Sequence, residues 1–185
     1  MTSCCSDIDF VFDQGHRNFF KNYQIGDTIY FKALNGDIDT ITVTNFDSLT
    51  VCSSMTINHK SISVEIKHLP INHWNGGQEI TDNKSVYLDQ ELITVDKVPQ
   101  DEKGNEAYYV GISFRDFLGE INNLKQTQTD TLLADIGIKN YWLIANELTI
   151  DRGDTTTIEK LIWTEKYGLT GYYKRNGDFY KIHRR

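Results

Sequence analysis

Hydrophobic and polar residues alternate along much of the chain, and this alternation is typical of half-buried β-strands. In residues 61–69, for example, Ile62, Val64 and Ile66 share one face, and most of the residues between them are polar. The chain is therefore expected to form a protein built from sheets. The same pattern predicts further strands over residues 28–34, 38–46, 86–95, 107–118, 131–136, 140–148, 157–164, 169–174 and 178–182.

Turn signals separate these predicted strands. Asn35-Gly36 and Asn176-Gly177 each lie between two alternating stretches. They predict hairpins with type I′ turns, because both residue types tolerate positive φ. Residues 70–83 contain Asn75-Gly76-Gly77 and are expected to form a loop. Helical periodicity is scarce, and residues 17–23 predict one short helix.

Together these elements predict a mostly β fold. We expect an antiparallel meander forming a sandwich or a partly open barrel, with at most one or two short helices. Several late strands carry apolar residues on both faces: Leu161 and Trp163 lie opposite Ile158 and Ile162, and Tyr172 lies opposite Tyr173. A sheet with two apolar faces must be covered on both sides or line a cavity.

Length and composition fit one folded domain. The chain has 185 residues, of which 39% are hydrophobic and 12% aromatic, and this is enough to build a hydrophobic core. Its net charge of −7 disfavours nucleic acid as a partner, because an acidic surface repels phosphate groups. No apolar run in the sequence reaches the roughly 20 residues that a membrane-spanning helix requires.

The N-terminus carries a candidate signal for the cell envelope. Thr2-Ser3-Cys4 resembles the end of a bacterial lipobox, in which the cysteine is acylated and becomes the first residue. The charged and apolar parts of a signal peptide do not precede it, and we expect Met1 to stand in their place. The acidic stretch after Cys4 resembles the surface-export signal of Bacteroidetes lipoproteins. This resemblance implies that residues 1–17 are a tether anchored to a membrane through a lipid on Cys4, and that residues 18–185 form the single β-rich domain.

Both ends of the predicted domain resemble uncharacterised lipoproteins of Bacteroidetes. Residues 158–180 contain an aromatic strand, the Tyr167-Gly168 corner and the Asn176-Gly177 hairpin. Residues 25–31 and Asn35-Gly36 resemble the opening hairpin of the same group. The resemblance implies a protein of the bacterial cell envelope, anchored to the outer membrane and either periplasmic or exposed at the surface. It implies no activity.

No arrangement of side chains in the sequence indicates catalysis, a metal or a cofactor. His59, His68 and His73 fall on different predicted elements, so no metal site is expected. Asp37 and Asp39, like the other carboxylate pairs of the chain, are expected in turns or on solvated faces. The sequence contains no Gly-x-Ser-x-Gly and no phosphate-binding loop.

Aromatic residues are the candidate binding groups. Trp142 and Trp163 are expected in the core, because aromatic side chains dominate the interiors of β-proteins. The alternative is a groove with aromatic walls, which binds sugars, lipids or peptides by stacking and burial. The candidate ligand-binding residues are Trp74, Tyr109, Tyr141 and Tyr173.

The sequence therefore favours a non-enzymatic envelope lipoprotein that binds a small molecule, glycan, lipid or peptide. One alternative is a structural or assembly component that acts through protein–protein contacts, and another is a glycan-active hydrolase. A deep pocket lined by Tyr and Trp favours binding, whereas a filled interior with a flat apolar patch favours assembly. Two carboxylates facing each other in a cleft favour hydrolysis.

Overall fold

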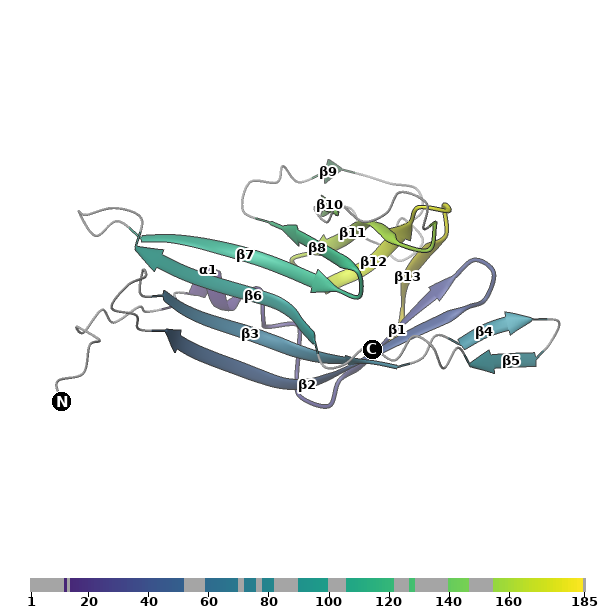
Figure 1. Ribbon diagram of the computed structural model, residues 1–185, viewed down its shortest axis with the longest axis horizontal. Helices are drawn as coiled ribbons and strands as arrows, with labels where there is room; N and C mark the ends of the chain where they lie inside the picture. The colour runs from purple at the N-terminus through teal and green to yellow at the C-terminus, as the bar shows by residue number, and fades with distance from the viewer. Residues whose placement is uncertain are drawn as a thin grey trace.

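The computed structural model describes residues 12, 14–51, 59–69, 72–75, 78–81, 90–99, 106–121, 127–128, 140–146 and 155–184, and Figure 1 shows how their elements are arranged. No helix in these ranges is long and apolar enough to cross a bilayer. The elements are α1 (Gln14–Arg17), β1 (Thr28–Ala33), β2 (Ile38–Val51), β3 (His59–His68), β4 (Asn72–Asn75), β5 (Gln78–Thr81), β6 (Gln90–Pro99), β7 (Glu106–Phe114), β8 (Phe117–Glu120), β9 (Thr127–Gln128), β10 (Asn140–Ala145), β11 (Ile158–Thr164), β12 (Gly168–Lys174) and β13 (Phe179–Arg184).

The strands form one antiparallel sheet that curls into a nearly closed barrel. Its order is β8-β7-β6-β3-β2-β1-β13-β12-β11-β10-β9, and the hairpin β4–β5 branches off β2. Most neighbours in the sheet are neighbours in the chain, and β3–β6, β1–β13 and β2–β4 are the exceptions. The mostly β prediction is confirmed, and the barrel is the architecture that forms.

Side chains close the barrel where β8 meets β10 and β11. The Asn146 amide donates hydrogen bonds to the carbonyl of Asp116 at 3.1 Å and to that of Ile158 at 2.7 Å. Its oxygen accepts a bond from the Leu118 N–H at 3.3 Å, and the Asp116 carboxylate accepts one from the Ile158 N–H at 3.3 Å. The Asn146 side chain therefore links the β7–β8 turn and β8 to β11 through hydrogen bonds to backbone groups.

The two Asn-Gly hairpins form where the sequence places them, but with a different turn. The Gly36 N–H donates to the Ala33 carbonyl at 3.1 Å, and Gly36 has a φ of 96°. Asn35 keeps a negative φ, so this is a three-residue loop in which only the glycine is left-handed. The Asn35 side chain accepts a bond from the Asp37 N–H at 3.0 Å, and this contact favours the observed loop over type I′. The hairpin at Gly177 repeats the same bonds.

Three local predictions are wrong. The helix is Gln14–Arg17, not residues 17–23, and it continues into turns. Residues 107–118 are two strands, because the chain reverses at Arg115-Asp116 and pairs Phe114 with Phe117. The stretch expected as a loop contains the hairpin β4–β5.

The later strands pack apolar side chains on both of their faces, as the sequence predicted. Leu161 and Trp163 belong to the barrel core, whereas Ile162 packs on the outer side with Tyr141 and Phe179. The prediction was wrong for Ile158, which belongs to the barrel core with Leu161 and not to the opposite face. The register between β11 and β12 shifts between Ile158 and Lys160, and this bulge resets the alternation.

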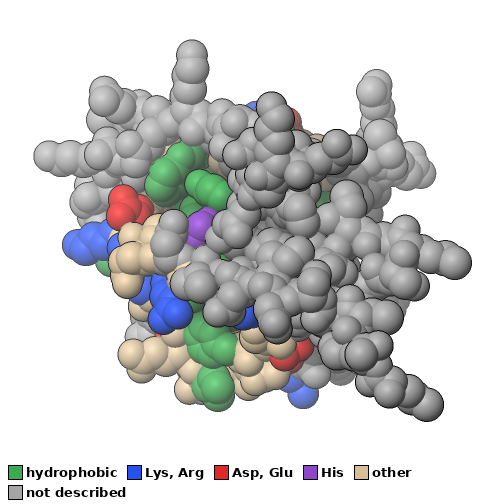
Figure 2. Space-filling view, turned by 90° about the vertical axis from the view of Figure 1, so that its left-hand side faces the viewer, with side chains coloured by type: hydrophobic (Ala, Val, Ile, Leu, Met, Phe, Trp, Pro, Cys, Tyr) green, Lys and Arg blue, Asp and Glu red, His purple; other side chains and the backbone are tan. Residues whose placement is uncertain are grey.

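The residues before β1 pack against one end of the barrel. The described residues of the predicted tether include Phe12 and His16, both of which are buried. The His16 ring lies 4.3 Å from that of Tyr108 and 5.8 Å from that of Phe12. Figure 2 shows the left-hand end of Figure 1, where a histidine side chain lies among hydrophobic ones.

Tyr23 fastens this N-terminal segment to β12. Its hydroxyl accepts a hydrogen bond from the Leu169 N–H at 2.9 Å, and its ring lies 6.0 Å from that of Trp163. The bond requires a glycine at position 168, where φ is 72° and a Cβ would overlap the Tyr23 hydroxyl. Gly26 also has a positive φ, of 93°, but faces open space.

We expect Gly168→Ala to destabilise the protein more than Gly26→Ala. Both variants pay for a left-handed alanine, about 1 kcal/mol. Gly168→Ala also displaces the Tyr23 hydroxyl, which adds about 1–3 kcal/mol. Urea unfolding measures the difference. In a Tyr23→Phe background the extra cost of Gly168→Ala should shrink, and an unchanged cost would contradict the clash.

Candidate functional site

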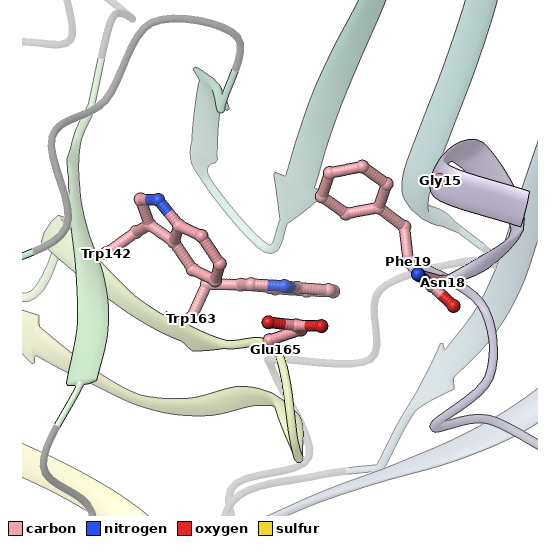
Figure 3. A pocket seen from close by; sticks show the side chains of 6 residues that line it. All are labelled: Gly15, Asn18, Phe19, Trp142, Trp163 and Glu165. Atoms are coloured by element: carbon pink, nitrogen blue, oxygen red, sulfur yellow. The ribbon is translucent and has the colours of Figure 1, made fainter.

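A pocket of about 240 Å³ opens between β10, β11 and the N-terminal segment. We call it the tryptophan pocket. Trp142 and Trp163 are register partners on β10 and β11, and they form one wall. The Phe19 ring faces them from the segment after α1, as Figure 3 shows. Gly15, Asn18 and Glu165 complete the described lining.

The polar groups of the tryptophan pocket lie at its rim. The Glu165 carboxylate projects beside the Trp163 indole (Figure 3). It is 3.5 Å from the Lys21 ammonium, and this ion pair is largely exposed, so it contributes little stability. The Asn22 amide holds the same turn by donating to the Glu165 carbonyl at 3.0 Å. The pocket therefore combines apolar aromatic walls with a rim that can donate and accept hydrogen bonds.

Trp142 and Trp163 are thus both core and pocket residues. Trp163 is 1% exposed and belongs to the barrel core, as expected. Trp142 is half-buried and packs against that core from β10. The sequence assigned both to the interior and did not indicate that their rings border a pocket.

Of the four candidate ligand-binding residues, the structure brings two together. Tyr141 and Tyr173 line a second hollow, of about 290 Å³, on the outer side of β10, β11 and β12. Tyr109 lies on β7 beside Asp96 of β6 and is 44% exposed. Trp74 lies in β4, and its side chain falls outside the described part of the chain, as does Cys4.

The second hollow, which we call the tyrosine hollow, has apolar walls and a charged border. Tyr173 stacks on Phe179 with ring centroids 4.4 Å apart, and Tyr141 and Leu143 belong to the same outer cluster. The charged residues that line the hollow are Glu159, Lys160, Lys174 and Arg175.

Sequence reasoning missed a buried ion pair inside the barrel. Asp39 is 0% exposed, and its carboxylate accepts hydrogen bonds from the Arg115 guanidinium, one of them at 3.0 Å from Nε. The Tyr172 hydroxyl donates to the same carboxylate at 2.6 Å. Asp37 is also buried, so the expectation that this pair lies on a solvated face is wrong. The alternation of the strand could have predicted this burial, because Asp39 lies on the same inward face as Ile41.

Gln90 links Arg115 to the buried His68. The Gln90 side-chain oxygen accepts bonds from the Arg115 N–H at 2.8 Å and from His68 Nε2 at 2.8 Å. Its amide donates to the Ser113 hydroxyl at 2.6 Å and to the Arg115 carbonyl at 3.1 Å. Burial, aided by the Arg115 cation and opposed by Asp39 and Gln90, lowers the pKa of His68 to about 4.

Burial also shifts the pKa of two neighbouring phenols and of one ammonium in the direction that favours their neutral forms. It raises the pKa of Tyr172 and of Tyr180, with Asp39 the next contribution to the first and Asp37 to the second. It lowers the pKa of Lys174, whose Nζ lies 4.7 Å from the Tyr180 ring centroid. Tyr172 and Tyr180 are too enclosed to meet a substrate, so their contacts with the two buried carboxylates act as structure.

No family model, curated protein or solved structure matches this chain. Within the described ranges, no group of three His, Cys, Asp or Glu side chains could hold a metal ion. The geometry of the tryptophan pocket and the tyrosine hollow therefore decides which functions are supported.

We expect acid to destabilise the protein through His68. The unfolded histidine binds a proton near pH 6.5, whereas the folded one resists it until about pH 4. The free energy of unfolding should therefore fall as the pH drops from about 6.5 to 4, by about 3 kcal/mol. Urea unfolding across this range should show a weaker dependence for His68→Gln than for the parent. His183→Gln, at an exposed histidine, serves as the control, and equal slopes in all three proteins would refute the assignment.

Proposed function

We propose that the protein is a non-enzymatic binding protein that holds a sugar ring of a glycan in the tryptophan pocket. The observation that carries this is a hollow of about 240 Å³ in which the half-buried rings of Trp142 and Phe19 face each other, with the buried Trp163 beside Trp142. A sugar ring presents an apolar C–H face that packs on an indole, and aromatic walls bind by such burial.

The rim of the pocket supports a polyhydroxylated ligand over a lipid tail. Glu165 accepts hydrogen bonds, the Lys21 ammonium donates them, and the Asn18 amide does both. A ring with hydroxyl groups along its edge satisfies these groups while its face stays on the indoles. An alkyl chain would cover the aromatic walls but could make no hydrogen bond to the rim.

The same rim favours binding over hydrolysis. Glycoside hydrolysis needs two carboxyl groups on either side of the scissile bond. Glu165 is the one carboxylate among the described residues that line the pocket, and it is paired with Lys21. The buried carboxylates Asp37 and Asp39 face the barrel interior and do not line it.

Removal of the Trp142 ring should weaken glycan binding. Defined neutral oligosaccharides would be screened on an array, and the best one measured by titration calorimetry. Trp142→Ala should raise its Kd about tenfold or more, because a ring stacked on an aromatic side chain contributes about 1–3 kcal/mol to binding. Trp142→Phe, which keeps an aromatic face, should bind at an intermediate level.

Tyr109→Ala is the matched control, because it removes an exposed aromatic ring on β7, which contributes no described residue to the pocket. Its Kd should equal that of the parent. If no oligosaccharide binds, the sugar assignment fails. If choline binds the pocket more tightly than any sugar, the assignment also fails, and the indoles with Glu165 form a site for a cation.

We further propose that this binding protein lies at the bacterial cell envelope, held by a lipid on Cys4. The support is the lipobox-like Thr2-Ser3-Cys4 in the sequence. Mass spectrometry of the protein from host membranes should find Cys4 as an acylated first residue. An unmodified Cys4 that follows an uncleaved upstream segment would contradict the anchor.

A further inference from the structure

One wall of the tryptophan pocket belongs to a part of the chain that lies outside the sheet. Gly15, Asn18 and Phe19 come from residues 14–23, which precede β1, whereas the opposite wall comes from β10 and β11. Figure 3 shows the Phe19 ring projecting from this segment toward the two tryptophans. The pocket is therefore complete only while residues 14–23 lie against the barrel.

Residues 14–23 depend on the barrel for their own structure. Their backbone bonds run within the segment: the Phe20 N–H donates to the Arg17 carbonyl at 3.0 Å, and the Tyr23 N–H donates to the Phe20 carbonyl at 3.0 Å. Helix α1 has four residues, and isolated helices shorter than roughly 12–15 residues are marginal in water. The packing of side chains on the barrel must supply the stability that these turns lack.

Side chains at the two ends of the segment attach it to the barrel. At one end the Tyr23 hydroxyl accepts the hydrogen bond from the Leu169 N–H, and at the other the His16 ring packs edge-on against Tyr108 of β7. Tyr23 and His16 are buried, whereas Phe20 between them is only partly buried against the core. Regions with few buried contacts open at a lower free energy than the core strands of the same protein.

The chain joins the sheet directly after this segment. The Gly26 N–H donates to the Val43 carbonyl at 2.9 Å, and the Val43 N–H donates to the Asp27 carbonyl at 2.9 Å. Gly26 has a positive φ and faces open space, so the backbone can change direction there without a clash. Residues 14–23 can therefore leave the barrel while β1 and β2 stay paired.

From these observations we infer that residues 14–23 form a strap, which docks on the barrel as one unit and creates the tryptophan pocket by docking. A ligand that touches Phe19 on one side and Trp142 on the other binds the docked state alone. Docking and binding therefore stabilise each other by the same factor. The inference rests on the proposed function for the identity of the ligand, but not for the behaviour of the strap in the free protein.

Hydrogen exchange of the free protein, followed by NMR, tests whether the strap opens as a unit. The amides of residues 16–23 should exchange together, at least about tenfold faster than buried amides of β3 and β6. Tyr23→Phe and Tyr108→Ala remove contacts at the two ends of the strap, and each should speed the exchange of the whole unit about fivefold. Neither residue is among the described residues that line the pocket.

Phe31→Leu is the matched control. Phe31 is fully buried and packs on Phe114 and Tyr172, and Phe114 lies at the opposite end of β7 from Tyr108. The variant weakens the barrel core, so the buried amides of β3 and β6 should exchange faster than in the parent. The exchange of residues 16–23 should stay within about twofold, because the strap opens without unfolding the barrel.

Exchange in the presence of ligand tests the coupling. The probe is the neutral oligosaccharide that binds most tightly on the array described above, added at ten times its Kd. The exchange of residues 16–23 should slow about tenfold, because the ligand must leave before the strap opens. The Gly36 amide, in the β1–β2 hairpin and outside the described lining of the pocket, should change by less than about twofold.

Three results would overturn the inference. The first is exchange of residues 16–23 at the rate of the buried amides of β3 and β6, and the second is a Tyr23→Phe effect that does not reach α1. The third is a bound oligosaccharide that leaves the exchange of residues 16–23 unchanged, and this result would leave the sugar proposal standing. If no oligosaccharide binds, the sugar proposal fails, and the exchange of the free protein alone decides whether the strap exists.

Discussion

The ion pair between Asp39 and Arg115 is the interaction on which the barrel depends. It joins β2 to the β7–β8 turn across the interior, and Asp39 also accepts a bond from Tyr172 of β12. Charges taken out of water are costly, and losing one partner of such a pair costs about 3–5 kcal/mol because the other is left buried alone. The sequence tolerates this cost because the guanidinium fork and the phenol together satisfy the carboxylate. Three strands far apart in the chain are thereby fixed relative to one another.

The same pair explains a turn that the residue types do not favour. Arg115 has a φ of 56°, a left-handed conformation that costs a residue with a Cβ about 1–3 kcal/mol. Gln90 holds both the N–H and the carbonyl of Arg115, and Asp39 holds its side chain. The turn brings Asp116 to Ile158, where Asn146 closes the barrel. A buried charge in β2 therefore determines where β8 lies, and β8 in turn fixes β10 beside it.

The sequence predicts the parts of this structure that depend on local periodicity. Period-two alternation located β1, β3 and most later strands, and the two Asn-Gly pairs located two hairpins but not their turn type. It did not locate the turn at Arg115-Asp116, because a long-range ion pair and not a turn residue reverses the chain there. It misplaced Asp39 for a related reason. A carboxylate is expected in solvent unless its buried partner is known, and the partner, Arg115, is 76 residues away in the chain.

The candidate sites follow from a sheet that is apolar on both faces. Along β10, Trp142 and Ile144 turn inward while Tyr141 and Leu143 turn outward, so one strand supplies a wall to each site. The sequence named Tyr141 and Tyr173 among four candidate aromatic residues, but their pairing in one hollow depends on strand register, which the sequence does not give. It assigned the inward tryptophans to the core alone, because a sequence pattern predicts that a ring is buried but not whether the ring also borders a pocket. Gly15, Asn18 and Phe19 of the N-terminal segment lie across from this wall and, with Glu165, complete the described lining of the pocket.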